Sequence, residues 1–237
     1  MLETRFGQAL VHGVELPEGE LIFLSRHGTS HGIAPHNINY RANIRALAEM
    51  GVQRILASNA VGSLRLDLEP DSLVAFDDFI DQTRVRPLTI LDDTADGVHH
   101  TDFSEPYCPE IRSALLAAAA GLDVDLLPRA TYVCADGPRF ESPAEVRMFA
   151  QLGGDVVGMT GLPEAVFARE SGICYAAVGI VTNFAAGLTT RPVDHTEVVE
   201  RMSVNVDSVR RLFLQVAVSM DVWRGCRCAE SVSTQPG

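Results

Sequence analysis

Basic residues are scarce in this sequence. Its 19 lysines and arginines are outnumbered by 31 aspartates and glutamates, and the formal net charge is −12. This balance argues against nucleic acid or an anionic membrane as the partner, because both are bound through clusters of positive charge. A small anion such as phosphate is still compatible, since a few well-placed cations can hold it.

Long apolar segments are also absent. No run approaches the ~20 apolar residues of a membrane-spanning helix, and no basic and apolar signal sequence opens the chain. We therefore expect a cytoplasmic protein whose five scattered cysteines are reduced and structural. Cys226 and Cys228 lie one residue apart, which is shorter than the spacing of a zinc-knuckle pair. No metal site is predicted.

Several motifs of catalysis and nucleotide binding are missing as well. The sequence contains no P-loop, no GxGxxG fingerprint and no HExxH pair. These absences argue against nucleoside triphosphates and dinucleotides. We predict that the protein works without a cofactor.

The chain has the length and composition of one globular α/β domain. It has 237 residues, of which 46% are hydrophobic and 21% are charged, so it can bury a sizeable core. Apolar runs typical of strands alternate with helical spacings, which indicates an α/β fold in one domain. Strands are predicted at 21–25, 54–57, 71–80, 130–135 and 155–158, and in a run that ends at 182–183. Helices are predicted at 39–50, 110–121, 143–152, 162–171 and 196–220.

Two segments fall outside this alternation. Residues 84 to 109 contain three prolines and few apolar runs, so they form a long excursion of the kind that is usually functional or interfacial. The polar residues 229–237 are predicted to be a tail without regular structure. The domain is therefore expected to span residues 1–228.

The predicted strands share one feature, which is that polar or glycine-containing residues follow them. These junctions are RHGT (26–29), SNAVGS (58–63), DGPRFE (136–141), GMTG (158–161) and TNFAAG (182–187). Ligands of α/β sheets gather outside the carboxyl ends of the strands. The five junctions are therefore expected to converge on one pocket.

The junction at Asn183 is the most informative one. An apolar strand stops at Thr182-Asn183 and gives way to small residues, as if it delivered one side chain to a site. A primary amide donates and accepts hydrogen bonds, so it suits a ligand edge that does both. The alternative is that Asn183 only caps a turn.

One group of junction residues could bind a phosphate group. Arg26, His27, Asn59, Ala60 and Thr160 offer a cation, amide and hydroxyl groups and backbone N–H groups, which together make a phosphate cradle. The alternative for the Arg-His pair is a packing or surface role.

For three further candidates a structural role is the alternative to ligand binding. They are Phe140, Glu141 and His195. Phe140 offers an apolar face to a flat ring or packs in the core. Glu141 binds a ligand or caps the helix that follows it, and His195 is a ligand contact or a helix cap.

Taken together and in this order, the junctions resemble the trimeric nucleoside phosphorylase family, which includes purine nucleoside and methylthioadenosine phosphorylases. The resemblance runs from about residue 4 to about residue 215. Its strongest segments are LSRHGTSHGIAPHNINYRANI, SNAVGSL, HTDFSEPYCP, DGPRFES, GMTGLPEAVFARESGICYA and VTNFAAG. It implies a single domain with a mixed central β-sheet flanked by helices.

The resemblance also implies a reaction and a set of roles. A purine nucleoside and inorganic phosphate, which is a co-substrate, give the free base and a pentose 1-phosphate. Arg26, His27, Asn59, Ala60 and Thr160 would hold the phosphate. Met159 would pack under the sugar, Phe140 would border the base, Glu141 and Asn183 would read it, and Ala185 would also contact the substrate. The catalytic residues would be Asn183, Glu141 and His27. His100 would enter the site of a neighbouring subunit in a homotrimer, with a hexamer as the alternative.

Glu141 and Asn183 indicate which base is read. Adenine-specific relatives carry Ser and Asp at these two positions. A 6-oxopurine presents N1–H as a donor and O6 as an acceptor, and adenine presents the opposite. An ionised Glu141 only accepts, so it fits N1–H and opposes the N1 of adenine. Hypoxanthine or guanine nucleosides are therefore the predicted substrates.

The group at the 5′ end of the sugar is indicated by His195. In the resembling pattern a histidine hydrogen-bonds the 5′-hydroxyl, whereas methylthio-specific relatives carry an apolar residue there. His195 thus favours inosine or guanosine, and S-methyl-5′-thioinosine is the alternative.

The first residues differ from the family pattern. Members begin with a strand and a glycine-rich phosphate loop, whereas residues 3–7 of this chain resemble the segment that follows that loop. The expectation is a sheet without its first strand and a site without that loop. The third alternative is therefore a shortened, weakly active paralog that binds purines or serves in an oligomer.

Overall fold

The fold is built on a mixed seven-stranded sheet. The computed structural model describes residues 1–16, 19–30, 32–91, 98–220 and 224–235, with only the backbone at 195, 197 and 233–235. The strand order is β7-β10-β11-β5-β12-β6-β9. The strands are β5 (Arg54–Ser63), β6 (Leu73–Ala75), β7 (Asp78–Gln82), β9 (Leu126–Leu127), β10 (Thr131–Ala135), β11 (Val156–Gly158) and β12 (Cys174–Phe184). The predicted α/β architecture with a mixed sheet is confirmed.

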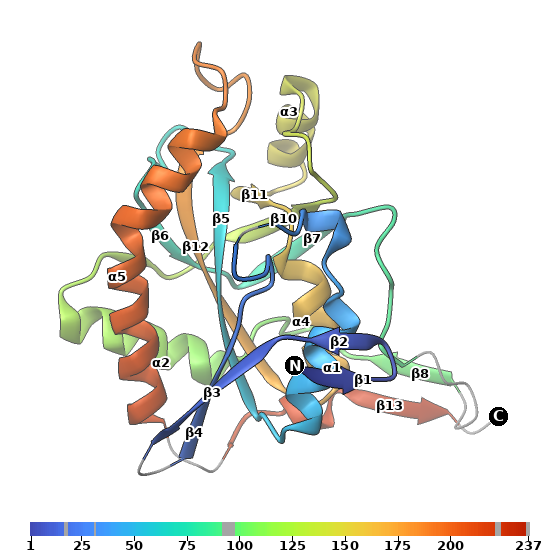
Figure 1. Ribbon diagram of the computed structural model, residues 1–237. Coiled ribbons are helices and arrows are strands. Elements are labelled where there is room, and N and C mark those ends of the chain that lie inside the picture. The colour runs from blue at the N-terminus through green and yellow to red at the C-terminus, as the bar shows by residue number, and fades with distance from the viewer. Residues whose placement is uncertain (17–18, 31, 92–97, 221–223, 236–237) are drawn as a thin grey trace.

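The two long strands β5 and β12 form the spine of the molecule (Figure 1). They run parallel from Arg54 opposite Cys174 to Ser63 opposite Phe184. Alternate residues of β12 point to opposite faces, and both faces are apolar, as expected for a central strand covered on both sides. Tyr175 and Ala177 belong to one buried cluster, and Cys174 and Ala176, which alternate with them along the strand, belong to another.

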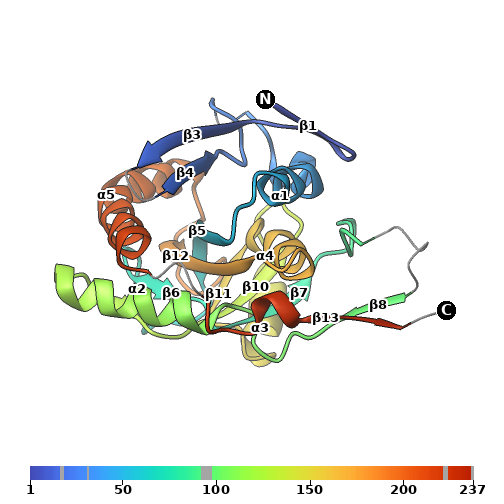
Figure 2. The same cartoon turned by 90° about the horizontal axis from the view of Figure 1, so that it is seen from below.

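Helices cover both faces of this spine (Figure 2). The helices are α1 (Tyr40–Glu49), α2 (Pro109–Leu122), α3 (Pro143–Gln151), α4 (Gly161–Glu170) and α5 (His195–Ser219), with short 3-10 turns at η1 (Pro35–Asn37) and η3 (Cys228–Glu230). Of these, α3 lies beyond the end of the spine and packs on β10 and β11. One face packs on α4, against which α1 lies, and the other packs on α2 and α5. No helix among the described residues is long and apolar enough to cross a membrane.

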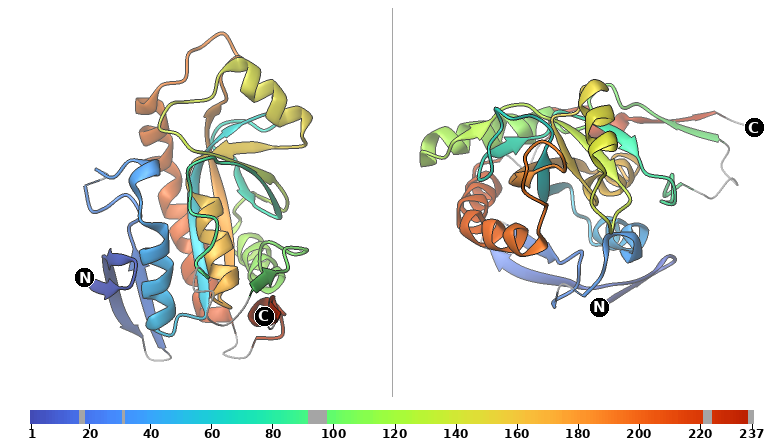
Figure 3. Two further views of the ribbon diagram at one scale, coloured as in Figure 1. Left: turned by 90° about the vertical axis from the view of Figure 1, so that its right-hand side faces the viewer. Right: turned by 90° about the horizontal axis from the view of Figure 1, so that it is seen from above.

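Three two-stranded ribbons lie outside the central sheet. They pair β1 (Leu2–Thr4) with β2 (Gly7–Ala9), β3 (Val11–Leu16) with β4 (Gly19–Leu24), and β8 (Val98–Thr101) with β13 (Val232–Gln235). The first two ribbons form a layer beside α1 (Figure 3). The ribbon of β8 and β13 extends beyond the body of the protein (Figures 1 and 2). The predicted strand at 21–25 is β4, which pairs with β3 and not with the central sheet.

Two sequence-based predictions are wrong. The segment 71–80 is not one strand: β6 and β7 lie on opposite sides of the central sheet, because the N–H of Phe76 binds Ala177 and that of Asp77 binds Ala130. The expected tail without regular structure contains η3 and β13, and β13 pairs along its length with β8. Its polar sequence gives no sign of this pairing, because the partner strand lies far away in the chain.

Candidate active site

The predicted phosphate residues meet where β5 passes the start of α4. The Nδ2 atom of Asn59 donates to the Oγ1 atom of Thr160 over 3.0 Å, and both side chains are buried. Thr160 immediately precedes α4, and its N–H and that of Gly161 both donate to the hydroxyl of Tyr132. The buried Oδ1 atom of Asn59 has no hydrogen-bond partner among the described residues. An unpaired buried acceptor beside a helix N-terminus indicates a position prepared for a polar ligand.

Arg26 is fixed beside this position by a buried carboxylate. Its Nε and Nη2 atoms donate to the two carboxylate oxygens of Glu164 over 2.7 Å each, and Nη1 donates to the carbonyl of Ser58 over 2.7 Å. Burial opposes the charge, but Glu164 more than offsets it and raises the pKa of Arg26 above its ordinary value. A guanidinium has five N–H donors, so these three bonds leave two for a ligand.

His27 and Ala60 lie next to these residues in the chain. The Nδ1 atom of His27 donates to the carbonyl of Ile33 over 2.8 Å, which fixes the ring within its own loop. Ala60 is exposed although Asn59 and Val61 on either side of it are buried. The small side chain of Ala60 therefore leaves this stretch of β5 accessible.

Glu141 is a buried carboxylate at the start of α3. Only 9% of the residue is exposed, and desolvation by burial raises the pKa of its carboxyl, although its own N–H opposes the shift. The helix is capped by Ser142, whose hydroxyl accepts from the N–H of Glu145, while the Glu145 carboxylate accepts from the N–H of Ser142. Because this capping box is complete, Glu141 is not the cap of α3. The alternative role that its sequence position allowed is wrong.

Asn183 is turned by a β-bulge at the end of β12. The pairing of β12 with β5 shifts between Val181 and Asn183, so one extra residue enters β12 and re-aims the side chains that follow. The Oδ1 atom of Asn183 accepts from the hydroxyl of Thr182, and its Nδ2 atom donates to the carbonyl of Phe184, each over 2.9 Å. The amide keeps one N–H and one acceptor position for a ligand. Asn183 lies within a strand and is not a turn cap.

Close backbone approaches bring the remaining junctions together. Gly187 has a φ of 83°, and a Cβ atom there would lie 2.6 Å from the Cβ atom of Pro143. Gly137 has a φ of 65°, and a Cβ atom there would lie 2.4 Å from the Sδ atom of Met159. Only glycine combines such conformations with such contacts. The segment after Asn183 thus packs on the start of α3, and the segment before Glu141 packs on Met159.

The sequence comparisons show the family of the chain. Residues 2–217 match the model of the Phosphorylase superfamily. The chain belongs to this superfamily.

Relatives and solved structures of the superfamily are similar over nearly the whole chain. The 6-oxopurine nucleoside phosphorylase of Pyrococcus furiosus is 46% identical over 241 residues, which cover 100% of this chain and 91% of that protein. The probable S-methyl-5′-thioinosine phosphorylase of Methanopyrus kandleri is 44% identical over 97% of this chain and 89% of that protein. The structure of methylthioadenosine phosphorylase from Schistosoma mansoni in complex with adenine has a TM-score of 0.87 and 32% identity, over 93% of this chain and 86% of that one.

In this phosphorylase, the convergence of the junctions does not require a parallel sheet. The sequence argument assumed that ligand residues gather at one carboxyl edge, but β11 runs antiparallel to β5. β11 therefore runs back along β5, and a Cβ atom on Gly158 at its end would lie 3.2 Å from the carbonyl of Ala60. This antiparallel pairing brings Thr160 against Asn59.

Arg86 connects the loops of the candidate site, and sequence reasoning missed it. Its guanidinium donates to the carbonyls of Asp136 and Met159, over 2.8 and 3.0 Å, and to that of Pro35. Only 4% of its side chain is exposed. Arg86 therefore ties together three loops that carry or flank the predicted site residues. No motif marks it, and the one available signal was its place in the long excursion.

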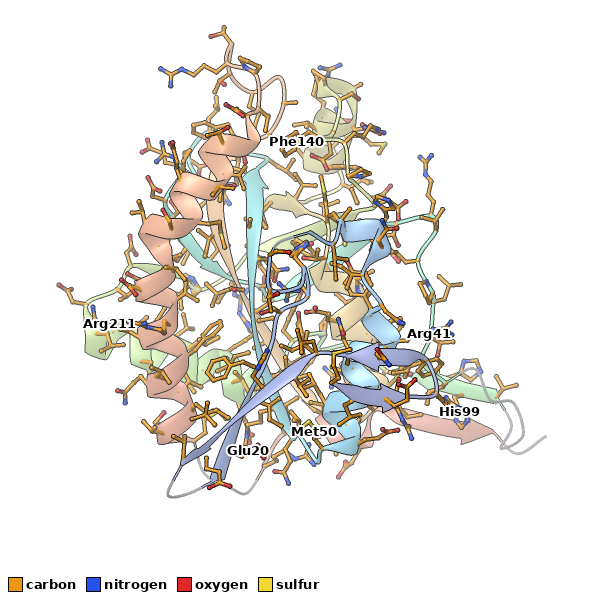
Figure 4. All side chains as sticks on the ribbon, viewed as in Figure 1. Glu20, Arg41, Met50, His99, Phe140 and Arg211 are labelled. Atoms are coloured by element: carbon orange, nitrogen blue, oxygen red, sulfur yellow. The ribbon has the colours of Figure 1, made fainter. Side chains whose placement is uncertain are left out.

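Three predicted residues are less closely connected to this site. Phe140 is 38% exposed and lies at the end of the molecule near α3 (Figure 4). His100 is on β8 in the projecting ribbon, whose neighbour His99 is labelled in Figure 4, away from the site of its own chain. His195 is the first residue of α5, and its side chain lies outside the described part of the structure. Ala185, by contrast, is buried in the cluster that also contains Val146 of α3.

Proposed function

We propose that the protein catalyses the phosphorolysis of 6-oxopurine nucleosides. Inosine or guanosine and inorganic phosphate give hypoxanthine or guanine and ribose 1-phosphate, in a step that serves purine salvage. The C1′–N9 bond breaks, its electron pair goes to the purine, and a phosphate oxygen forms the new bond to C1′. The observation that carries the proposal is the desolvated Glu141 carboxylate at the start of α3, the element on which the segment after Asn183 packs.

The phosphate half of the reaction needs fixed donors more than an acid or a base. Breaking the glycosidic bond gives the sugar cationic character, and the phosphate both stabilises that charge and attacks it. The two remaining N–H groups of Arg26 and the Thr160 hydroxyl are held in place before phosphate binds, by Glu164 and Asn59 respectively. Because these donors are already fixed, little free energy is spent on ordering them in the transition state.

The base half of the reaction stabilises the leaving group. Negative charge accumulates on the purine as the bond breaks, and the remaining N–H of Asn183 can donate to N7 or O6. Glu141 accepts from N1–H and fixes the orientation of the ring. The bonds of the amide to Thr182 and Phe184 prevent it from rotating, so the donor is directed before the base arrives.

An assay panel tests this proposal. Inosine, guanosine, S-methyl-5′-thioinosine and adenosine are each incubated with the protein, with and without phosphate. We expect phosphate-dependent release of base from inosine and guanosine. Adenosine as the best substrate would contradict the roles of Glu141 and Asn183. Absence of phosphate-dependent turnover of all four would favour a purine-binding or oligomer-forming protein without this activity.

S-Methyl-5′-thioinosine is the second candidate substrate. It is favoured by the 44% identity to a relative whose name carries that substrate. The base contacts are the same for both candidates, so only the group at the 5′ end differs. Turnover of S-methyl-5′-thioinosine without turnover of inosine would exclude a 5′-hydroxyl contact by His195.

The assembly that we propose is a homotrimer. The ribbon of β8 and β13 extends away from the body of the chain, so it can reach a neighbouring subunit (Figure 2). His100 lies on this ribbon and would complete the neighbour's site. Light scattering gives the mass in solution, and a monomeric mass in a fully active preparation would contradict this role for His100.

The pH dependence of the reaction should report on Glu141. Its raised pKa means that the carboxylate becomes protonated at a higher pH than the ~4.3 of an ordinary glutamate. Protonation removes the acceptor for N1–H, so kcat/KM for inosine should fall as the pH decreases through this raised pKa. The Glu141→Gln variant should be less active and should lack this step.

The wild-type protein and the Glu141→Gln variant are compared at each pH, because the ionisation of phosphate then affects both rates equally. Because burial disfavours the ionised form in the folded state, Glu141→Gln should not lower stability at neutral pH. Parallel pH profiles of the two proteins would show that Glu141 does not read the base.

A further inference from the structure

Four of the five cysteines come together at the end of the spine opposite Asn183. They are Cys108, which precedes α2, Cys174, which begins β12, and Cys226 and Cys228 from the segment after α5. Their Sγ atoms all lie within 4.8 Å of one another, and those of Cys174 and Cys226 are 3.3 Å apart. Three of the side chains are buried and that of Cys226 is half-buried. The five cysteines were expected to be scattered thiols, and the fold gathers four of them.

The spacing of these sulfurs fits a tetrahedral metal ion. Zinc–sulfur bonds of about 2.3 Å place the sulfurs of a tetrahedral site about 3.8 Å apart. The Sγ atoms of Cys174 and Cys226 are 3.3 Å apart, slightly closer than that value, and no pair in the cluster is separated by more than 4.8 Å. Shifts of less than about an ångström would therefore place all four thiolates at bonding distance from one ion. Four thiolates in this geometry favour zinc over the common hard cations.

Two positively polarised groups lie beside the cluster. Cys108 is at the N-terminus of the 14-residue helix α2, where the helix dipole stabilises negative charge. The guanidinium of Arg224 lies 4.0 Å from the Sγ atom of Cys174 and is held there by its bond to the carbonyl of Gly172. A zinc ion with four thiolates carries a net charge of −2, which this arginine partly compensates. The half-buried Cys226 gives an ion a route into the cluster.

We propose that Cys108, Cys174, Cys226 and Cys228 bind one structural zinc ion. All four positions of a tetrahedral site are then filled by protein, so the ion has no open position for a substrate. The site fastens the segment after α5 to the start of α2 and to the start of β12. That segment continues into η3 and β13, so the ion lies at the base of the projecting ribbon.

The sequence alone gave no indication of this site. Cys226 and Cys228 are separated by one residue, and the other two ligands come from distant parts of the chain. The prediction of no metal rested on local spacings, namely that of this cysteine pair and the absence of an HExxH-like pair among the histidines. A metal site can combine one short pair with two ligands from other elements, which becomes visible only in the fold.

Metal analysis of the full-length protein tests the proposal. Purified under reducing conditions and without an immobilised-metal column, the protein should contain about one zinc ion per chain. Cobalt substitution should give the intense thiolate charge-transfer and visible bands of a tetrahedral four-sulfur site. The Cys226→Ser and Cys228→Ser variants should lose the zinc, whereas Cys134→Ser should keep it. Cys134 is the matched control because it is also buried but lies outside the cluster.

Chelation provides a readout that does not depend on the variants folding. Removal of zinc from the reduced wild-type protein should lower the melting temperature, and stoichiometric zinc should restore it. Absence of zinc in the purified protein together with no uptake of zinc or cobalt would overturn the proposal. So would zinc retained in both serine variants, or a mass lower than that of the reduced chain by the hydrogens of disulfides within the cluster.

Discussion

The double variant Glu141→Ser/Asn183→Asp is expected to prefer adenosine to inosine. The wild-type site offers an acceptor to N1–H, and mismatching with adenine leaves buried polar groups unpaired. Sites built on such pairs discriminate by roughly 10⁴-fold. The double variant removes the carboxylate that opposes adenine N1 and adds an acceptor for its 6-amino group. The ratio of kcat/KM for the two nucleosides, at saturating phosphate, measures the change.

The two single variants and the isosteric variant Glu141→Gln serve as controls for this change in base preference. Glu141→Gln keeps the shape of the side chain but replaces an acceptor-only group with one that also donates, so it should weaken discrimination without reversing it. Neither site residue forms part of the capping box of α3, so the helix should be retained in all variants. An undiminished preference of the double variant for inosine, with its fold intact by circular dichroism, would refute the assignment of these residues to the base.

The second large effect is expected from Glu164→Gln. Its carboxylate binds Arg26 through two hydrogen bonds and also accepts from the hydroxyl of Tyr175, over 2.9 Å. The carboxylate side chain is 6% exposed and that of Arg26 is 17% exposed. Removing one partner of a buried pair leaves an uncompensated charge, which costs about 3–5 kcal/mol, and the residual exposure of Arg26 places the loss at ~3 kcal/mol. Urea denaturation measures it, and the KM for phosphate should rise because Arg26 is no longer held.

Glu49→Gln is the matched control for Glu164→Gln. Glu49 pairs with Arg45 one helical turn away over 2.7 Å, but these side chains are 37% and 43% exposed. Exposed pairs of this type contribute about 0.3–0.5 kcal/mol, so this variant should remain close to the wild type in stability and in KM for phosphate. Equal losses of stability for the two variants would contradict the claim that burial makes the Arg26–Glu164 pair important.

Local sequence patterns predicted the parts of the site that depend on local structure. The helices and most of the strands follow from periodicity, and Asn183 and Thr160 lie at the ends of their strands as expected. Asn59 and Thr160, which stand far apart in the chain, were assigned to one cradle, and their side chains share a hydrogen bond.

The features that the sequence did not reveal all depend on contacts between distant segments. The bulge before Asn183 is defined by register against β5, and β13 exists because β8 pairs with it. The segment 71–80 has the alternation of a single strand, yet β6 and β7, which both begin within it, lie on opposite sides of the central sheet. Arg86 binds three carbonyls, which are present in every sequence and so leave no pattern. The cysteine cluster combines three separate segments.

The register of β5 against β12 also fixes the distance between two amide side chains along the strands. Asn59 stands opposite Gly179, and Asn183 stands opposite Gly62, three residues further along the same ladder. At about 3.3 Å per residue the two amides are separated by roughly 10 Å along the strands. If Asn59 and Asn183 contact the two ends of one ligand, as proposed, the backbone hydrogen bonds of two buried strands set the length of that ligand. Loop substitutions can change which base or 5′ group is accepted, but they leave this length unchanged.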